Sequence, residues 1–397
     1  MKPAKNSILT VNGGSSSIKF AFYEIADPLK QLFYGEMEGI GTNNTSLNFQ
    51  NTVTNQKYSV KIKLDGSVSP VIILIDWLEK QEGFDSVKVI GHRIVCGMDH
   101  TGPAKITVEL LNELKDIWAY DPEHLPIEIK LIEEFEKRNP AITQIACFDT
   151  SFHSSMPAVA KMLSIPRRYS TQGIKRYGFH GLSYAYLIED LKRTAGAEVA
   201  KGKLIIAHLG SGASIAAIRE GKAIDTSMGF SPASGLPMGT RTGDLDPGVA
   251  AYLIKSEGLN STQFNHLINH ESGLMGISET SSDMRDLLKS QSTDHRAAEA
   301  VDFFCYQTKK WIGAYAAALG GLDTLVFSGG IGENSAEIRD RICTNLQFLG
   351  IEIDEAANLK NEAIISGKTS KVLVRVIRTN EELMIAKLTH QLFETLS

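Results

Sequence analysis

Short apolar runs of strand character alternate with longer amphipathic stretches along this chain. Runs typical of β-strands lie at residues 8–11, 18–23, 87–90, 142–148, 204–208, 214–218, 324–328 and 372–377. Strands that alternate with amphipathic helices are typical of layered proteins in which helices cover a sheet. The pattern therefore predicts an α/β fold.

The clearest helix is predicted at residues 294–319, DHRAAEAVDFFCYQTKKWIGAYAAAL. Steps of four and three residues place one set of positions on a single helix face: Ala297, Val301, Phe304, Thr308, Trp311, Tyr315 and Ala318. We interpret this face as core. The helix is expected to stop at Gly320, and a buried strand then leads into a glycine loop, SGGIGEN (328–334).

A second helix is predicted close to the C-terminus, in TNEELMIAKLTHQLF. Thr379 and Glu382 have the T-x-x-E spacing of a capping box, which places the start of the helix here.

One strand-turn-strand pattern occurs twice, in VNGGSSSIKFAFYE (11–24) and AHLGSGASIAAIRE (207–220). Two copies almost half a chain apart predict two similar domains. The boundary is expected near FDTSFHSSMPAVA, which gives domains 1–150 and 151–385. Because no linker rich in Pro and Ser separates them, we expect a packed hinge.

Composition and charge exclude several partners. The chain has 397 residues, with 41 basic and 46 acidic side chains and a formal charge of −5, and no basic stripe suggests a nucleic-acid groove. The longest apolar run, VIILIDWL, is interrupted by Asp76 and is far shorter than the roughly 18 residues of a membrane span. Neither a signal peptide nor a zinc spacing is present, so we expect a cytoplasmic protein with reduced cysteines: Cys96, Cys147, Cys305 and Cys343.

The glycine-rich turns point to a phosphate ligand. Asn12-Gly13 alone predicts a type I′ hairpin turn, but Ser15 to Ser17 and Lys19 add hydroxyl and ammonium donors that could surround phosphate oxygens. This is not a Walker loop, because the pattern G-x-x-x-x-G-K-[ST] is absent. Two further turns contain the small residues that let a backbone approach a ligand: Gly210, Gly212 and Ser214, and then Gly329, Gly330 and Gly332. We expect a nucleotide held between the two domains.

The chain resembles the acetate and propionate kinase family. The motifs that carry the resemblance run in order from residue 11 to about 386: VNGGSSSIKF, GHRIV, FDTSFH, RYGFHG, AHLGSGASIAAIREG, DTSMGFSP, MGTRTGDLDPG, ESGLMGISETSSDMR, FSGGIGENS and TNEELMIA. The resemblance implies two actin-like ATPase (ribonuclease H-like) domains with a nucleotide cleft between them. It also implies a homodimer, and a C-terminal helix, 386–397, that packs back on the first domain.

The resemblance assigns roles in phosphoryl transfer from ATP to a small carboxylate. Arg93 and Arg241 would bind the carboxylate and the moving phosphoryl group, since the reaction brings two anions together. His180 would hydrogen-bond the phosphoryl oxygens, and Asp149 would help to place magnesium and Arg241. Taken alone, a histidine such as His180 is more often a core histidine, and Asp149 could equally be a helix cap. An apolar pocket for the acyl group is implied at Val95, Phe179 and Pro232.

The resemblance also assigns nucleotide and metal contacts. Asn12 and Glu381 would hold Mg²⁺, for which Mn²⁺ could substitute, while Glu382 caps the helix. Lys19 is the remaining candidate cation for phosphate. The nucleotide, ATP or ADP, would lie against three segments: His208, Leu209, Gly210, Ser211 and Gly212; Asp283, Met284 and Arg285; and Gly330, Ile331, Gly332, Glu333 and Asn334.

Several positions depart from the family pattern. Ser211 replaces an asparagine of H-L-G-N-G, Cys96 and Met98 follow Arg93 in place of His and Gly, and Glu123 replaces an apolar residue expected near the acyl methyl group. Acetate kinase is the leading hypothesis and propionate kinase the nearest alternative, because one methylene group discriminates weakly. A non-catalytic nucleotide sensor and an actin-type filament are the alternatives from other classes.

Overall fold

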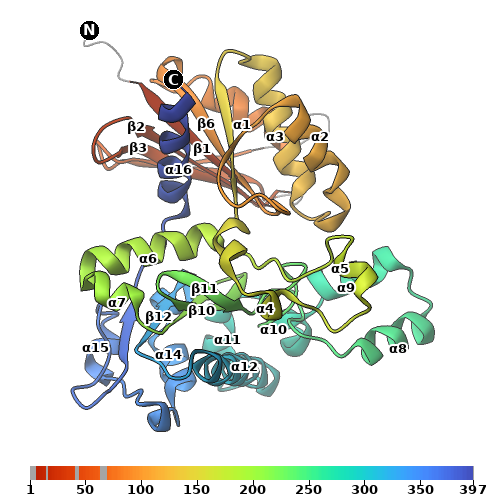
Figure 1. Ribbon diagram of the computed structural model, residues 1–397, viewed down its shortest axis with the longest axis vertical. Helices are drawn as coiled ribbons and strands as arrows, with labels where there is room; N and C mark the ends of the chain where they lie inside the picture. Colours follow the sequence, from red (N-terminus) through yellow and green to blue (C-terminus); the bar gives the residue numbers. More distant parts are fainter. Residues whose placement is uncertain (1–5, 15–16, 41–43, 63–68, 397) are drawn as a thin grey trace. The chain divides into compact units, whose positions relative to one another are not determined.

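The chain divides by its internal contacts into two compact units, residues 1–151 with 380–397 and residues 152–379. The structure is a computed structural model, which describes residues 6–14, 17–40, 44–62 and 69–396 (Figure 1). The expected division after residue 150 differs by one residue. The segment that returns to the first unit begins at residue 380 and not at 386.

The first unit is built on one mixed sheet with strand order β5-β4-β3-β2-β1-β6-β8-β7. Its strands are β1 (Ser7–Gly13), β2 (Ser17–Glu24), β3 (Lys30–Glu38), β4 (Ser46–Asn51), β5 (Lys57–Lys61), β6 (Val87–Ile94), β7 (Ala104–Lys105) and β8 (Thr143–Phe148). Its helices are α1 (Pro70–Leu78), α2 (Val108–Asp116), α3 (Leu125–Arg138) and α16 (Glu381–Leu396).

Helices cover both faces of the central strands of this sheet. On one face, Leu131 and Phe135 of α3 and Leu74 of α1 join a buried cluster with Leu9 and Ile90. On the other side, α16 packs against β1, β6 and β8 (Figure 1). The sheet core is therefore closed by apolar side chains from helices that are far apart in the sequence.

The second unit is built on a smaller sheet with strand order β11-β10-β9-β12-β13. Its strands are β9 (Leu204–Leu209), β10 (Ala213–Arg219), β11 (Lys222–Thr226), β12 (Thr324–Ser328) and β13 (Leu373–Val376). Its helices are α4 (Ala158–Lys161), α5 (Arg167–Ser170), α6 (Gly181–Ala195), α7 (Ala197–Lys201), α8 (Pro247–Glu257), α9 (Ser261–His270), α10 (Gly273–Ser278), α11 (Met284–Ser290), α12 (His295–Leu319), α13 (Gly329–Asn334), α14 (Ala336–Cys343) and α15 (Glu355–Leu359).

The two sheets share one topology. In the first, β3, β2 and β1 are antiparallel neighbours and β6 and β8 continue parallel to β1. In the second, β11, β10 and β9 are antiparallel neighbours and β12 and β13 continue parallel to β9. The repeat predicted from the two hairpin sequences is thus confirmed at the level of strand order.

The first predicted ligand turn forms a hairpin, but its turn does not lie at Asn12-Gly13. Asn12 pairs with Lys19 and Gly13 with Ile18, so both continue the ladder, and the turn closes later with Gly14 N donating to Ser17 O at 2.8 Å. Ser15 and Ser16, predicted to donate to phosphate, lie outside the described residues.

The predicted glycine loop after β12 is instead the short helix α13. Gly329, with φ of +76°, turns the chain directly into this helix, and a Cβ there would lie 2.6 Å from Leu209 O. A residue with a side chain would collide with β9, so only glycine allows the helix to begin here.

Two predictions about helices also need correction. The residue that caps α16 is Asn380, whose Oδ1 accepts from Leu383 N at 2.9 Å, and the expected capping box of Thr379 and Glu382 does not form. On α12, most of the predicted face is buried, but Trp311 is half-buried and Ala318 is exposed.

Candidate active site

In the first unit, the candidate residues lie where three neighbouring parallel strands end. Asn12 and Arg93 lie near the ends of β1 and β6, and Val95 follows β6 directly. Asp149 follows β8 directly, and its N–H donates to Ile94 O at 2.8 Å. The carboxyl ends of parallel strands in open α/β sheets are the usual place for ligands.

Arg93 lies between two buried carboxylates. Its Nη2 donates to Asp149 Oδ2 at 3.1 Å, and its Nη1 donates to Glu128 Oε1 at 3.2 Å and to Gly13 O at 3.4 Å. Burial alone would lower the pKa of Arg93, but Asp149, Glu128 and Glu381 together raise it. The guanidinium is therefore charged and held in one orientation.

The candidate metal ligands contact each other. Asn12 Nδ2 donates to Glu381 Oε2 at 3.2 Å, across the join between β1 and the first turn of α16. Lys19 lies nearby; burial would lower the pKa of its ammonium, but the carboxylates of Glu382, Glu381 and Glu36 raise it. Among the described residues, no three His, Cys, Asp or Glu side chains gather into a metal-binding group.

In the second unit, His180 is fixed by hydroxyl groups rather than buried as a core histidine. His180 Nδ1 lies 2.9 Å from Ser214 Oγ, which in turn lies 2.5 Å from Tyr184 OH. The ring stacks on His208 with centroids 4.3 Å apart. His92 differs: it is fully buried, Gln144 is its partner at 2.7 Å, and burial lowers its pKa to about 4.

Arg241 and His180 lie beside the same glycine. A Cβ at Gly212, in the turn between β9 and β10, would lie 3.3 Å from His180 Nε2 and 3.9 Å from Arg241 Nη1. Arg241 Nη1 also donates to Pro232 O at 3.2 Å. The structure therefore brings together three of the residues that the sequence marked separately.

The segment that carries Arg241 is held against the N-terminus of α10. Leu274 N donates to Met238 O at 2.8 Å, and Ser272 N donates to Thr240 O at 3.0 Å. Gly273, with φ of +62°, makes this contact possible, because a Cβ there would lie 2.2 Å from Met238 O and 2.6 Å from Arg241 O.

We expect Gly273→Ala to displace Arg241, lower kcat strongly and destabilise the protein by about 2 kcal/mol or more, since the added carbon overlaps backbone atoms at a left-handed position. Thermal unfolding and steady-state kinetics measure both effects. Gly313→Ala in α12 is the matched control, because a Cβ there meets no described atom within 4 Å and alanine favours a helix. Equal behaviour of the two variants would contradict the expectation.

A cavity of about 700 Å³ lies in the second unit, next to the β9–β10 turn. Its size is in the range of small-molecule sites. It is lined by Gly210, Ser211, Ser282, Asp283, Met284, Arg285, Leu288, Gly330, Ile331, Asn334 and Ser335. All three segments that the sequence assigned to the nucleotide thus contribute to one cavity, and Ser282, Leu288 and Ser335 are additions that tertiary proximity alone reveals.

The other predicted nucleotide residues are not among those that line this cavity. Glu333 Oε1 accepts from Gly329 N at 2.9 Å and from Thr379 N at 3.1 Å, so it fixes α13 rather than lining the cavity. Gly332 O accepts from the buried Arg339 at 2.8 Å. Leu209 is buried in β9, and His208 supports His180.

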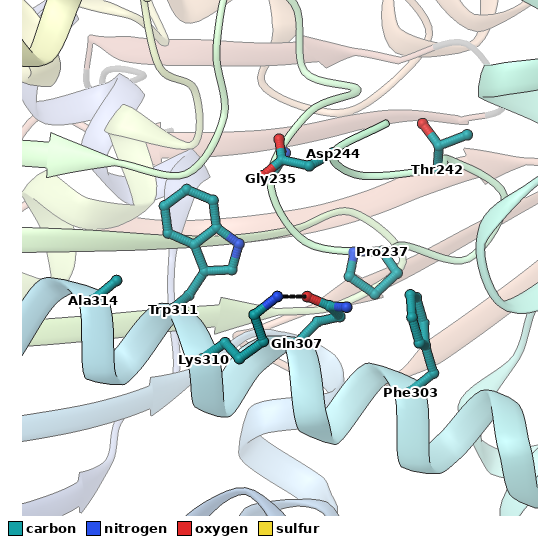
Figure 2. A pocket seen from close by; sticks show the side chains of 9 residues that line it. All are labelled: Gly235, Pro237, Thr242, Asp244, Phe303, Gln307, Lys310, Trp311 and Ala314. Carbon is teal, nitrogen blue, oxygen red and sulfur yellow. Dashed lines mark hydrogen bonds between the residues drawn. The ribbon is translucent and has the colours of Figure 1, made fainter. Parts of the chain in front are cut away.

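A second cavity, of about 330 Å³, lies between α12 and the loop of residues 235–244, which carries Arg241 (Figure 2). Trp311 and Phe303 project from α12 toward this loop, and Lys310 Nζ donates to Gln307 Oε1 at 3.3 Å. This cavity explains why Trp311 is only half-buried. It contains none of the residues that the sequence assigned to the site.

The residues predicted for the acyl pocket belong to different units. Val95 is buried in the first unit, whereas Phe179 is buried and Pro232 half-buried in the second. Their grouping into one pocket therefore stays a prediction.

Glu123, which departs from the family pattern, is half-buried. Met98 has φ of +48°, a backbone conformation that suits the glycine of the family pattern better.

Other predictions concern the whole chain. Cys96, Cys147, Cys305 and Cys343 are buried and form no disulfide, as expected. In the part of the chain that the structure describes, no helix has both the length and the apolar character needed to cross a membrane.

The repeated strand order and the glycine-lined cavity define an α/β protein of the actin-like ATPase fold class. The chain belongs to the acetokinase family, whose model matches residues 7–387. As a member of this family, it is a kinase.

Individual relatives cover nearly the entire chain. An acetate kinase from Rhodopseudomonas palustris (strain TIE-1) is 42% identical over 387 residues, which is 96% of each chain. A crystal structure of a propionate kinase from Francisella tularensis subsp. tularensis SCHU S4 is 36% identical with a TM-score of 0.89, covering 97% of this chain and 99% of that one. A crystal structure of an acetate kinase from Porphyromonas gingivalis is 35% identical with a TM-score of 0.86, covering 98% and 100%.

Proposed function

We propose that the protein catalyses reversible transfer of the γ-phosphoryl group of ATP to acetate, giving acetyl phosphate and ADP. The observation that carries the proposal is the arrangement around Gly212. His180 Nε2 and the Arg241 guanidinium lie beside this residue, and the same turn lines the cavity of about 700 Å³ through Gly210 and Ser211. A nucleotide in this cavity would have its phosphates near one cation and one ring nitrogen.

Charge neutralisation and positioning are the contributions that this reaction requires. A carboxylate is already a nucleophile, so no general base is needed, and direct in-line transfer between two anions depends on cations that offset their repulsion. Arg241 suits this task because a guanidinium binds phosphoryl oxygens through two parallel hydrogen bonds. When Ser214 donates to His180 Nδ1, the ring proton is on Nε2, which can then donate to a phosphoryl oxygen.

Arg93 is the residue that we assign to the acceptor carboxylate. Asp149 and Glu128 set its orientation, so the conformational entropy of this long side chain is already lost before substrate binds. Asp149 acts on this substrate through Arg93.

The nucleotide would bind with a divalent metal ion, for which Asn12 and Glu381 are suitable. The amide oxygen of Asn12 and the carboxylate of Glu381 are hard oxygen ligands, and Mg²⁺ needs only one or two carboxylates because it keeps several waters. Asn12 and Glu381, which contact each other, therefore fit Mg²⁺, with Mn²⁺ as a substitute. When bound, the ion would neutralise phosphate charge.

We expect Glu381→Ala to raise the metal concentration needed for half-maximal activity by about 10-fold or more, as loss of a metal-site group does elsewhere. Glu382→Ala is the matched control and should change this half-maximal metal concentration by less than about twofold. Glu382 Oε1 is buried without a hydrogen-bond partner among the described residues, and burial raises the pKa of this carboxyl group. Magnesium titrations of both variants measure the effect, and the reverse order would show that the two roles are exchanged.

Hydroxylamine trapping of acyl phosphate tests the proposed function. The enzyme is incubated with Mg²⁺ and ATP and with acetate, propionate, butyrate, bicarbonate or no acid. Acetate as the best acceptor supports the proposal. Propionate as the best acceptor would favour the second candidate, a propionate kinase. The similarity to the Francisella tularensis propionate kinase supports this candidate.

No turnover with any acid, despite measurable ATP binding, would favour a nucleotide sensor instead. The family resemblance also supports the proposal of a cytoplasmic homodimer. Sedimentation of the purified protein would test its oligomeric state.

A further inference from the structure

Glu128 is a buried carboxyl group that the sequence did not single out. It lies on α3 with 1% of its surface exposed, and its carboxyl group faces the end of β6. Oε1 accepts from Arg93 Nη1 at 3.2 Å and from Val95 N at 3.2 Å, while Oε2 accepts from Val95 N at 3.0 Å. It therefore contacts both the guanidinium assigned to the acceptor and the backbone beside it.

The charges around Arg93 do not balance. Arg93 contributes one positive charge, while Glu128 and Asp149, both in contact with it, contribute two negative charges when ionised. Asp121, in the turn before α3, adds a further carboxylate near Glu128, although His124 Nδ1 lies 2.9 Å from its Oδ1. Glu381 of α16 is a further negative charge that raises the pKa of Arg93. Lys19 of β2 is a second positive charge, which Arg93 repels. An acetate ion that approaches Arg93 would thus meet a net negative cluster.

A proton on Glu128 would remove this obstacle without breaking the contacts that hold Arg93. Oε1 accepts from both Arg93 and Val95, whereas Oε2 accepts only from Val95. A proton on Oε2 would leave Oε1 able to accept from both donors. The cluster of Arg93, Asp149 and Glu128 would then be neutral and could accept one more anion.

We propose that Glu128 is a positioning residue that couples acceptor binding to proton uptake: the carboxylate substrate binds at Arg93 when Glu128 is protonated on Oε2. The proton comes from solvent as the substrate enters and returns to solvent when the site empties. This inference rests on the proposed function, because it concerns the acceptor of that same reaction.

The environment of Glu128 places this protonation step in an accessible pH range. Burial raises the pKa of Glu128 to about 8, although Arg93 and the N–H of Val95 lower it and Asp121 and Asp149 raise it further. Below this pH the group is largely protonated and the acceptor binds well. Above this pH only a small fraction of the enzyme carries the proton that acceptor binding requires, so KM for the acceptor rises with pH.

The test is the pH dependence of KM between pH 6.5 and 9.5. In the unmodified enzyme, KM for acetate should rise above about pH 8 and approach about a tenfold increase per pH unit, while KM for ATP changes little. Glu128→Gln, which is neutral and can still accept from Arg93 and Val95, should give a low KM for acetate that no longer depends on pH. Glu133→Gln, an exposed change on the same helix, is the control and should keep the rise.

Two further measurements separate this role from a structural one. Glu128→Asp keeps a titratable group, so the rise should persist even where the shorter side chain weakens binding, and it replaces Glu128→Gln if that variant does not fold. Calorimetry of acetate binding at pH 8.5, in buffers of different ionisation enthalpy, should show proton uptake in the unmodified enzyme and none in Glu128→Gln.

The outcomes distinguish the two proposals. Turnover of acetate with a KM that is flat across this range, or with the same rise in Glu128→Gln, would overturn the role of Glu128 and leave the proposed function intact. Absence of turnover with every acid in the unmodified enzyme would overturn the proposed function and, with it, this coupling.

Discussion

Arg241→Ala is expected to reduce kcat by about 10³-fold or more while ATP affinity stays within about threefold. Loss of an arginine that stabilises a transferring phosphoryl group has effects of this size. The Arg241 guanidinium lies beside Gly212 and His180, whereas the cavity assigned to the nucleotide is lined by other residues. Turnover by hydroxylamine trapping and ATP affinity by calorimetry therefore report separate parts of the site.

Arg219→Ala is the matched control, since this arginine is exposed at the end of β10 and should leave both values unchanged. Arg241→Ala should leave the backbone conformation of the Arg241 segment unchanged, because the hydrogen bond that Met238 N donates to Arg241 O at 3.1 Å involves only main-chain atoms. Retained turnover in Arg241→Ala would remove this residue from the proposed mechanism.

Arg93→Ala is expected both to abolish acceptor binding and to destabilise the first unit. Removing one partner of a buried ion pair leaves uncompensated charge and costs about 3–5 kcal/mol. Above the pH at which Glu128 takes up its proton, the side chains of Glu128 and Asp149, each 1% exposed, would lose their common cation. Urea unfolding measures the stability loss, and saturation with acetate measures the loss of binding.

The sign of the pH effect on this variant follows from the carboxyl groups. As pH falls, Glu128 takes up a proton and its uncompensated charge disappears, so the stability difference from the unmodified protein should shrink. Arg138→Ala is the control, because Arg138 pairs with Asp76 and Glu79 near the surface and such pairs contribute about 0–1 kcal/mol. Equal losses in the two variants would contradict the burial argument.

Sequence reasoning located most strands because their apolar runs are short and bounded by turn residues. β1, β6, β9 and β12 all lie where the pattern predicted them. It failed at the first ligand turn, because the ladder continues through Asn12 and Gly13 and local turn preference is weaker than strand pairing. It also missed β3, β4, β5, β7 and β11. In β4 and β5, at the sheet edge, much of the surface stays polar.

The α/β class, the repeated hairpin and most of the residues that gather in the second unit are predictable from short motifs, since glycine turns, arginines and histidines with chemical roles occur in them. Only the tertiary structure revealed Glu128 and the support that Glu333 gives to α13. Glu128 lies 35 residues from Arg93, and Glu333 lies 46 residues from Thr379. A buried carboxyl group acquires its role from the partners that folding brings to it, because burial and neighbouring charges, and not its own position in the chain, decide its protonation and its hydrogen bonds.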